Sequence, residues 1–125
     1  MREEFIKTKN TTGLTDAKKI AKFALEKQAK DVVILDLKKI STICNYYLIC
    51  SGENTTQVKA IYDYIIKKSR KAKIKVQHSE VDKTYNWILI DFSNLIVHIF
   101  TETTREFYNL EYLWRQAKRI SLSKK

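Results

Sequence analysis

Few side chains of this sequence have the types and spacing that catalysis requires. Asp36 and Asp91 stand alone on separate expected strands. Metal-assisted phosphoryl or nucleotidyl transfer needs at least two carboxylates that converge on one ion. No Asp-x-Asp or Glu-x-Glu pair occurs anywhere in the chain. We therefore expect a protein that is not an enzyme, with no small-molecule substrate.

Histidine and cysteine are equally sparse. His78 and His98 fall on different expected strands, without a Cys or Asp at ligand spacing, so both are interpreted as structural or interface histidines. Cys50 lies in an apolar run and is expected to be a small buried hydrophobe, whereas Cys44 is interpreted as a loop thiol. We expect neither a metal ion nor a cofactor.

Ser51-Gly52 stands between an expected strand and an expected helix, where phosphate-binding turns occur. No GxxxxGK[ST] or GxGxxG pattern accompanies it. A strand-to-helix turn favours glycine for conformational reasons alone, and this interpretation is preferred to a phosphate site.

The elements that would position these residues follow from apolar periodicity and capping signals. Residues 1–14 are interpreted as a polar lead-in to a single domain over residues 15–125, and Thr15 is the expected N-cap of the first helix. Asn54 with Gln57, and Thr103 with Glu106, form capping-box patterns that open two further helices. The helices are expected over about 16–30, from 54 to about 72, and from 103 to about 117; the strands over 32–35, 46–50, 76–81, 87–92 and 95–101.

This order, αββαβββα, predicts an α/β (α+β) fold with a mixed sheet of about five strands and helices packed on it. The last helix is expected to bury one apolar side, formed by Phe107, Leu110, Leu113, Trp114 and Ala117.

Ser93-Asn94 separates two strong strands and predicts a tight hairpin in which 92 opposes 95, 90 opposes 97 and 88 opposes 99. One face of the hairpin is then entirely apolar: Ile88, Ile90, Phe92, Leu95, Val97 and Ile99. The other face is mixed and resembles the centre of an interface: Trp87, Leu89, Asp91, Ile96, His98 and Phe100. We predict partner contacts at Trp87, Leu89, Ile96, His98 and Phe100; the alternative is that further helix covers this face.

The chain carries 24 Lys and Arg against 14 Asp and Glu, a net charge of +10 that suits a polyanion such as RNA. Lysine outnumbers arginine 19 to 5, which is also typical of an A/T-rich genome, so both explanations stay open. Six cations fall in nine residues: Lys67, Lys68, Arg70, Lys71, Lys73 and Lys75. They indicate either RNA-backbone contact or a solvated helix end whose charge suits the helix dipole.

The residues near the N-terminus include acidic side chains and no apolar stretch, which does not fit a secretory signal. With only two cysteines, both expected to stay reduced, the cytoplasm is the expected compartment.

Several segments together resemble the ribosomal silencing factor family, also called RsfS or Iojap. They occur in the family's order and spacing over about residues 15–117: Asn45-Tyr-Tyr-Leu-Ile-Cys-Ser-Gly, Gln57-Val-Lys-Ala-Ile, Trp87-Ile-Leu-Ile-Asp, Ile96-Val-His-Ile-Phe and Arg105-Glu-Phe-Tyr-Asn-Leu-Glu-Tyr-Leu-Trp. The chain departs from the family at Asn45, where Asp is usual, and at Ser93-Asn94, where Gly-Asp is usual. Gln116-Ala117 likewise stands where the family has Asp-Ala, and relatives are commonly less basic.

The resemblance implies a nucleotidyltransferase-like fold without its catalytic carboxylates. It implies binding to large-subunit ribosomal protein L-fourteen, with a block on joining of the small subunit and repression of translation when nutrients are short. It also implies that Trp87 is a binding residue. Two alternatives remain: a nucleotidyltransferase-like enzyme that uses Asp36 and Asp91, and a ribosome-assembly factor bound mainly through RNA.

Overall fold

The computed structural model describes residues 2–122 of the 125-residue chain. The elements follow one another as α1 (Arg2–Glu26), β1 (Lys30–Asp36), β2 (Tyr46–Gly52), α2 (Thr55–Lys71), β3 (His78–Val81), β4 (Trp87–Asp91), β5 (Leu95–Thr101), α3 (Glu102–Tyr108), α4 (Leu110–Leu113) and β6 (Lys118–Ile120). None of the helices within residues 2–122 is both long and apolar enough to cross a membrane.

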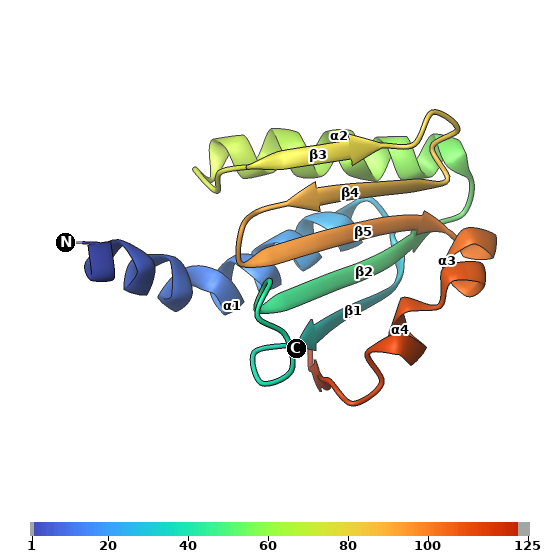
Figure 1. Cartoon of the computed structure of the whole chain (residues 1–125). Helices are drawn as coiled ribbons and strands as arrows, with labels where there is room; N and C mark the ends of the chain where they lie inside the picture. The colour runs from blue at the N-terminus through green and yellow to red at the C-terminus, as the bar shows by residue number, and fades with distance from the viewer. Residues whose placement is uncertain (1, 123–125) are drawn as a thin grey trace.

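The strands form one mixed sheet in the order β3-β4-β5-β2-β1-β6 (Figure 1). The central strands β2 and β5 run parallel, and every other neighbouring pair is antiparallel. Helices α1 and α2 lie on one face of the sheet, while α3 and α4 follow the end of β5 (Figure 1). The predicted mixed α/β class is confirmed, with β6 as a sixth strand that the sequence pattern did not indicate.

The hairpin formed by β4 and β5 has the predicted register. Ile88 pairs with Ile99 and Ile90 with Val97, and the N–H of Phe92 donates to the carbonyl of Leu95 over 2.8 Å. All six side chains of the predicted apolar face are buried in the cluster under α1 and α2: Ile88, Ile90, Phe92, Leu95, Val97 and Ile99. A two-residue turn fixes which residues of the two strands oppose each other. Locating the turn correctly therefore also determines which side chains lie on each face of the hairpin.

Helix α1 begins well before the predicted N-cap. It is already helical at Arg2, so the interpretation of residues 2–14 as a polar lead-in outside the helix, and of Thr15 as its cap, is wrong. The helix ends at Glu26 rather than near residue 30. Gln28 adopts φ 63°, and the N–H of Ala29 donates back to the carbonyl of Ala24 over 3.0 Å, as in a Schellman motif.

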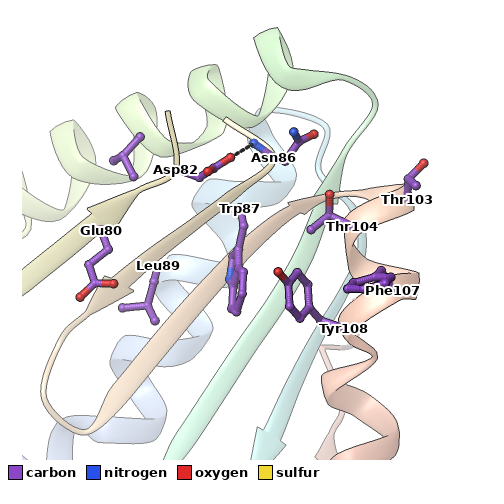
Figure 2. A pocket seen from close by; sticks show the side chains of 10 residues that line it. Glu80, Asp82, Asn86, Trp87, Leu89, Thr103, Thr104, Phe107 and Tyr108 are labelled. Atoms are coloured by element: carbon purple, nitrogen blue, oxygen red, sulfur yellow. Dashed lines mark hydrogen bonds between the residues drawn. The ribbon is translucent and has the colours of Figure 1, made fainter. Parts of the chain in front are cut away.

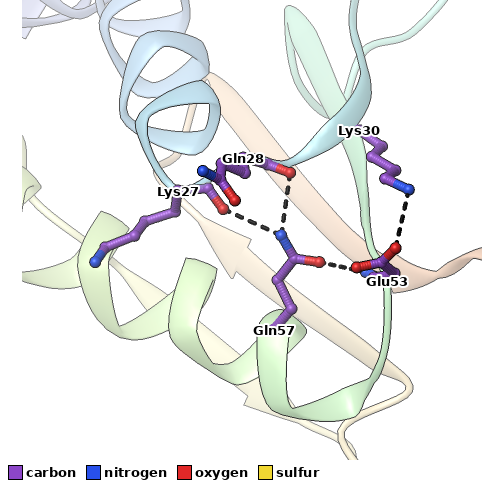
Figure 3. A network of polar contacts seen from close by, with 5 residues as sticks. All are labelled: Lys27, Gln28, Lys30, Glu53 and Gln57. Atoms are coloured by element: carbon purple, nitrogen blue, oxygen red, sulfur yellow. Dashed lines mark hydrogen bonds and ion pairs between the residues drawn. The ribbon is translucent and has the colours of Figure 1, made fainter.

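The predicted N-cap Asn54 of α2 is present, but the reciprocal bond of the predicted capping box goes to Glu53 instead of Asn54, and Gln57 also ties α2 to α1 (Figure 3). The side chain of Asn54 accepts from the Gln57 N–H over 2.9 Å, and the side-chain oxygen Oε1 of Gln57 accepts from the Glu53 N–H over 2.5 Å. The amide nitrogen of Gln57 donates to the carbonyls of Lys27 and Gln28 at the end of α1. One side chain thus satisfies polar backbone groups at two helix termini.

The predicted helix from 103 to about 117 is two short helices. The first, α3, begins at Glu102 after Thr101, without a capping bond from that side chain, and Asn109 then takes the left-handed conformation with φ 49° and ψ 54°. Asparagine tolerates this region better than other non-glycine residues, so the chain can turn sharply there. The turn rotates Phe107 and Leu113 out to solvent, which corrects the prediction that they lie on the buried side.

Candidate partner-binding face

The mixed face of the hairpin lies opposite α1 and α2, as predicted, but the chain partly covers it. Trp87, Leu89 and Ile96 are half-buried. Phe100 is 0% exposed and His98 is 4% exposed, so these two cannot contact a partner directly in this structure. The predicted set of five partner-contacting side chains is therefore reduced to the three that keep accessible atoms.

The cover comes from the residues that follow β5. Leu110, Trp114 and Ala117 pack against an apolar cluster on this face that contains Phe100 and Ile49. Tyr47 of β2 lies between them and the hairpin, with its ring 4.6 Å from that of His98 and 6.0 Å from that of Trp114. The segment thus covers the middle of the sheet and leaves the β3–β4 edge open.

Trp87 connects the covered and open parts. Its indole nitrogen donates to Nδ1 of His98 over 3.1 Å. Its ring stacks on Phe100 with 5.1 Å between centroids. The ring of Tyr108 in α3 also lies beside it, with 4.6 Å between centroids (Figure 2). The indole is held by three aromatic neighbours, so its orientation is fixed before any partner arrives.

His98 is held as a neutral imidazole. Burial lowers the pKa of its ring to about 4. Because Nδ1 accepts the indole hydrogen, the ring proton must lie on Nε2. Nε2 is buried and has no hydrogen-bond partner among the described residues. The role of His98 is therefore internal: it positions Trp87.

A groove of about 620 Å³ opens beside Trp87 (Figure 2). Trp87 and Leu89 of β4 line it together with Phe107 and Tyr108 of α3. Phe107 is 79% exposed, and Tyr108, Tyr112 and Leu113 are also exposed. Of these four, Phe107 and Tyr108 line the groove, and exposed aromatic side chains at a groove are typical of a binding surface. The sequence pattern missed these α3 and α4 residues because it placed Phe107 and Leu113 inside a continuous helix.

The six predicted RNA-contacting cations lie on the α2 side of the molecule. Lys67, Lys68, Arg70 and Lys71 belong to the last turns of α2, and Lys73 and Lys75 follow it. Lys68 lies over the rings of Phe23 and Tyr64. Arg70, Lys73 and Lys75 line a second cavity of about 530 Å³, so they share one surface.

The residues that catalysis would need are not assembled. Asp36 lies on β1 and Asp91 on β4, with β5 and β2 between these strands. Three strand spacings separate them by roughly 14 Å, too far for both carboxylates to bind one ion. Where the structure describes side chains, no group of three or more His, Cys, Asp or Glu residues could hold a metal ion.

The remaining candidates have structural roles. Burial raises the pKa of Cys44 to about 11 and that of Cys50 to about 12, so neither is a thiolate at neutral pH. The Ser51 hydroxyl accepts a hydrogen bond from Nη1 of Arg105 over 2.8 Å. A Cβ on Gly52 would lie 2.9 Å from the backbone nitrogen of Val58, so glycine allows close approach of α2 rather than a left-handed turn.

Arg105 joins the turn at Asn109 between α3 and α4, here called the α3–α4 elbow, to the sheet. It is buried, and its Nε and Nη2 donate to the two carboxylate oxygens of Glu111 over 3.0 and 2.9 Å. The same guanidinium holds Ser51 of β2. The guanidinium also holds the pKa of Glu111 below its usual value. The pair clamps the two ends of the turn at Asn109 and so fixes where α3 presents its aromatics.

Comparisons with known proteins give a consistent relationship. The chain is 38% identical over 92 residues to "Ribosomal silencing factor RsfS" of Bacillus subtilis, a match that covers 74% of this chain and 78% of the relative. It is 37% identical over 97 residues to the protein of the same name from Halalkalibacterium halodurans, covering 78% and 83%.

A crystal structure of a Bacillus halodurans protein matches with a TM-score of 0.72 at 33% identity, covering 82% of this chain and 94% of that one. The model of the family described as "Ribosomal silencing factor during starvation" matches residues 10–125. The match takes in the hairpin, the groove and the α3–α4 elbow, and the chain belongs to the ribosomal silencing factor (RsfS) family.

Proposed function

We propose that this protein binds the large ribosomal subunit in the cytoplasm through ribosomal protein L-fourteen. Bound there, it occupies a surface that the small subunit needs, so it blocks subunit joining and represses translation under nutrient limitation. Family membership supports the ribosomal role, and the aromatic groove beside Trp87 supports a protein partner.

The observation that carries the proposal is the combination of a fixed tryptophan and exposed aromatics at one groove. Trp87 is oriented by His98 and Phe100, and Phe107 and Tyr108 extend the apolar surface into solvent. Tryptophan and tyrosine are enriched among the residues that dominate binding energy, and a fixed orientation lowers the entropy lost on binding.

The direct test is co-sedimentation of the purified protein with isolated subunits, followed by a subunit-joining assay. We expect binding to large subunits and a lower yield of joined ribosomes. Trp87→Ala should weaken both. Equal sedimentation with small subunits, or normal joining when the large subunit is saturated, would contradict the proposal.

A second contact, to ribosomal RNA, is supported by the cations on the α2 side. Arg70, Lys73 and Lys75 line one cavity and suit contact with a phosphate backbone. Such a surface also fits the alternative function, a ribosome-assembly factor that binds mainly through RNA. Replacing these three residues by glutamine should reduce the salt dependence of large-subunit binding. Binding that depends on these residues and is indifferent to Trp87→Ala would favour the assembly-factor alternative.

A further inference from the structure

The groove beside Trp87 has an electrostatic character opposite to that of the chain. The protein carries a net charge of +10. Among the described residues that line the groove, Glu80 and Asp82 are acidic and none is lysine or arginine. Although the protein is basic, the lining of its aromatic groove contains two carboxylates and no lysine or arginine.

Figure 2 shows Glu80 and Asp82 on the β3 side of Trp87, with the Asp82 carboxylate directed toward Asn86, and Tyr108 and Phe107 on the α3 side. Glu80 of β3 pairs with Leu89 of β4, and the N–H of Asp82 donates to the carbonyl of Trp87 over 3.2 Å, so each acid stands beside a floor residue. Tyr108 and Phe107 form the opposite wall. Any group that enters meets an aromatic floor, an aromatic wall and an acidic rim.

Both rim carboxylates belong to exposed residues. Hydrogen bonds from the Thr84 hydroxyl and the Asn86 N–H lower the pKa of Asp82. The Glu80 side chain is 70% exposed and lies 3.0 Å from Nε2 of His78, a solvent-accessible pair that a partner can replace.

A guanidinium group matches this arrangement better than other ligands. It is planar and stacks on indole and phenol rings, and its forked N–H groups pair with carboxylates. An ammonium group is more strongly hydrated and pairs without the fork, while a phosphate would be repelled by both acids.

We propose that the groove takes an arginine side chain of the protein partner, stacked against Trp87 and paired with Glu80 and Asp82. The inference rests on the proposed function, since it names the chemistry by which the same face recognises ribosomal protein L-fourteen. It assigns opposite electrostatic roles to two surfaces: the acidic groove for a protein cation, and the α2 cations for RNA.

The test measures affinity for isolated ribosomal protein L-fourteen at low and high salt. Glu80→Gln is the main variant, because Asp82 also organises the 82–86 turn. We expect it to weaken binding about five-fold at low salt, with a smaller effect at high salt. The matched control is Glu53→Gln: Glu53 is 68% exposed, pairs with Lys30 at 3.4 Å and lies outside the groove lining, so it should change affinity little.

The partner residue is found by replacing each arginine of L-fourteen with lysine in turn. One replacement should weaken binding to the wild-type protein about five-fold and have little further effect on the Glu80→Gln variant, because both changes disrupt the same pair. Thermal unfolding of each variant shows whether the fold is intact.

The outcomes separate this inference from the proposed function. If Glu80→Gln leaves the affinity unchanged while Trp87→Ala weakens binding, the proposal of a bound arginine is wrong, and the proposal that the partner binds at the face around Trp87 still stands. Tighter binding of Glu80→Gln overturns it in favour of an anionic partner, since removing a carboxylate then relieves repulsion. No binding of L-fourteen by the wild-type protein overturns both proposals.

Discussion

The indole nitrogen of Trp87 donates a hydrogen bond to Nδ1 of His98 over 3.1 Å, from one strand of the hairpin to the next. The bond requires a neutral imidazole, because a protonated ring would present a second N–H to the indole N–H. Burial supplies this condition by disfavouring the charged form. The buried His98 therefore sets the orientation of Trp87, the side chain that we propose binds the partner.

We expect stability to fall in acid because of His98. Its pKa lies near 6.5 in the unfolded chain and about 4 in the folded protein, so the unfolded chain binds the extra proton between these values. The stability from the neutral ring is fully present above pH 6.5 and is lost as the pH falls toward 4, by about 3 kcal/mol.

The measurement is urea unfolding between pH 7 and 4, with His98→Phe and His78→Gln beside the wild-type protein. The first variant should lose this pH-dependent difference and the second should keep it, since His78 is exposed. Parallel curves for wild type and His98→Phe would show that His98 is not responsible.

Trp87 and Ile90 lie on opposite faces of β4 and should respond oppositely to truncation. Trp87→Ala should cost about 2 kcal/mol or more of binding, near a thirty-fold loss of affinity. Its stability cost should stay below about 2 kcal/mol, because the indole is only half-buried. Ile90→Ala, in the core, should cost about 2–5 kcal/mol of stability and leave the affinity of the folded fraction unchanged.

Thermal unfolding alongside affinity for L-fourteen measures both effects. If Trp87→Ala unfolds the domain while its folded fraction binds normally, the tryptophan is structural and the partner lies elsewhere.

The hairpin shows what sequence pattern predicts well, and His98 and Phe100 show where it stops. Register and face follow from a local two-residue turn, so Trp87 and Ile90 were placed correctly. Burial of His98 and Phe100 depends on residues 110–117 returning over the sheet, which alternation within a strand cannot report. The path of residues 110–117 over the sheet depends on Asn109, which adopts a left-handed conformation. This residue ends α3 within a stretch whose apolar periodicity suits one continuous helix. The short strand β6 pairs only with β1, so it too needs this return.

Arg105→Met should destabilise the protein by about 3 kcal/mol. The guanidinium is buried and holds Glu111 and Ser51, so removing it leaves a partly buried carboxylate without its nearest cation. Arg115→Met is the control, because that arginine is exposed and lies over the Tyr112 ring. Urea unfolding should separate the two variants clearly. Equal, small losses would show that the Arg105–Glu111 pair does not hold the elbow.

Asn109 provides the sharpest test of how α3 is placed. Its φ of 49° lies in the left-handed region, where a Cβ without a hydrogen-bonding side chain costs roughly 1–2 kcal/mol. Asn109→Ala should therefore lower stability by about 1 kcal/mol, whereas Asn109→Gly, which is free of that strain, should lower it less or not at all. The Ala variant favours a straight continuation of α3, which would displace α4 and separate Glu111 from Arg105, the pair that holds α3 with Phe107 and Tyr108 in place. We therefore expect Asn109→Ala to weaken binding to L-fourteen more than Asn109→Gly does. Urea unfolding and affinity for the two variants give the comparison, and equal behaviour of alanine and glycine would show that the turn is not required.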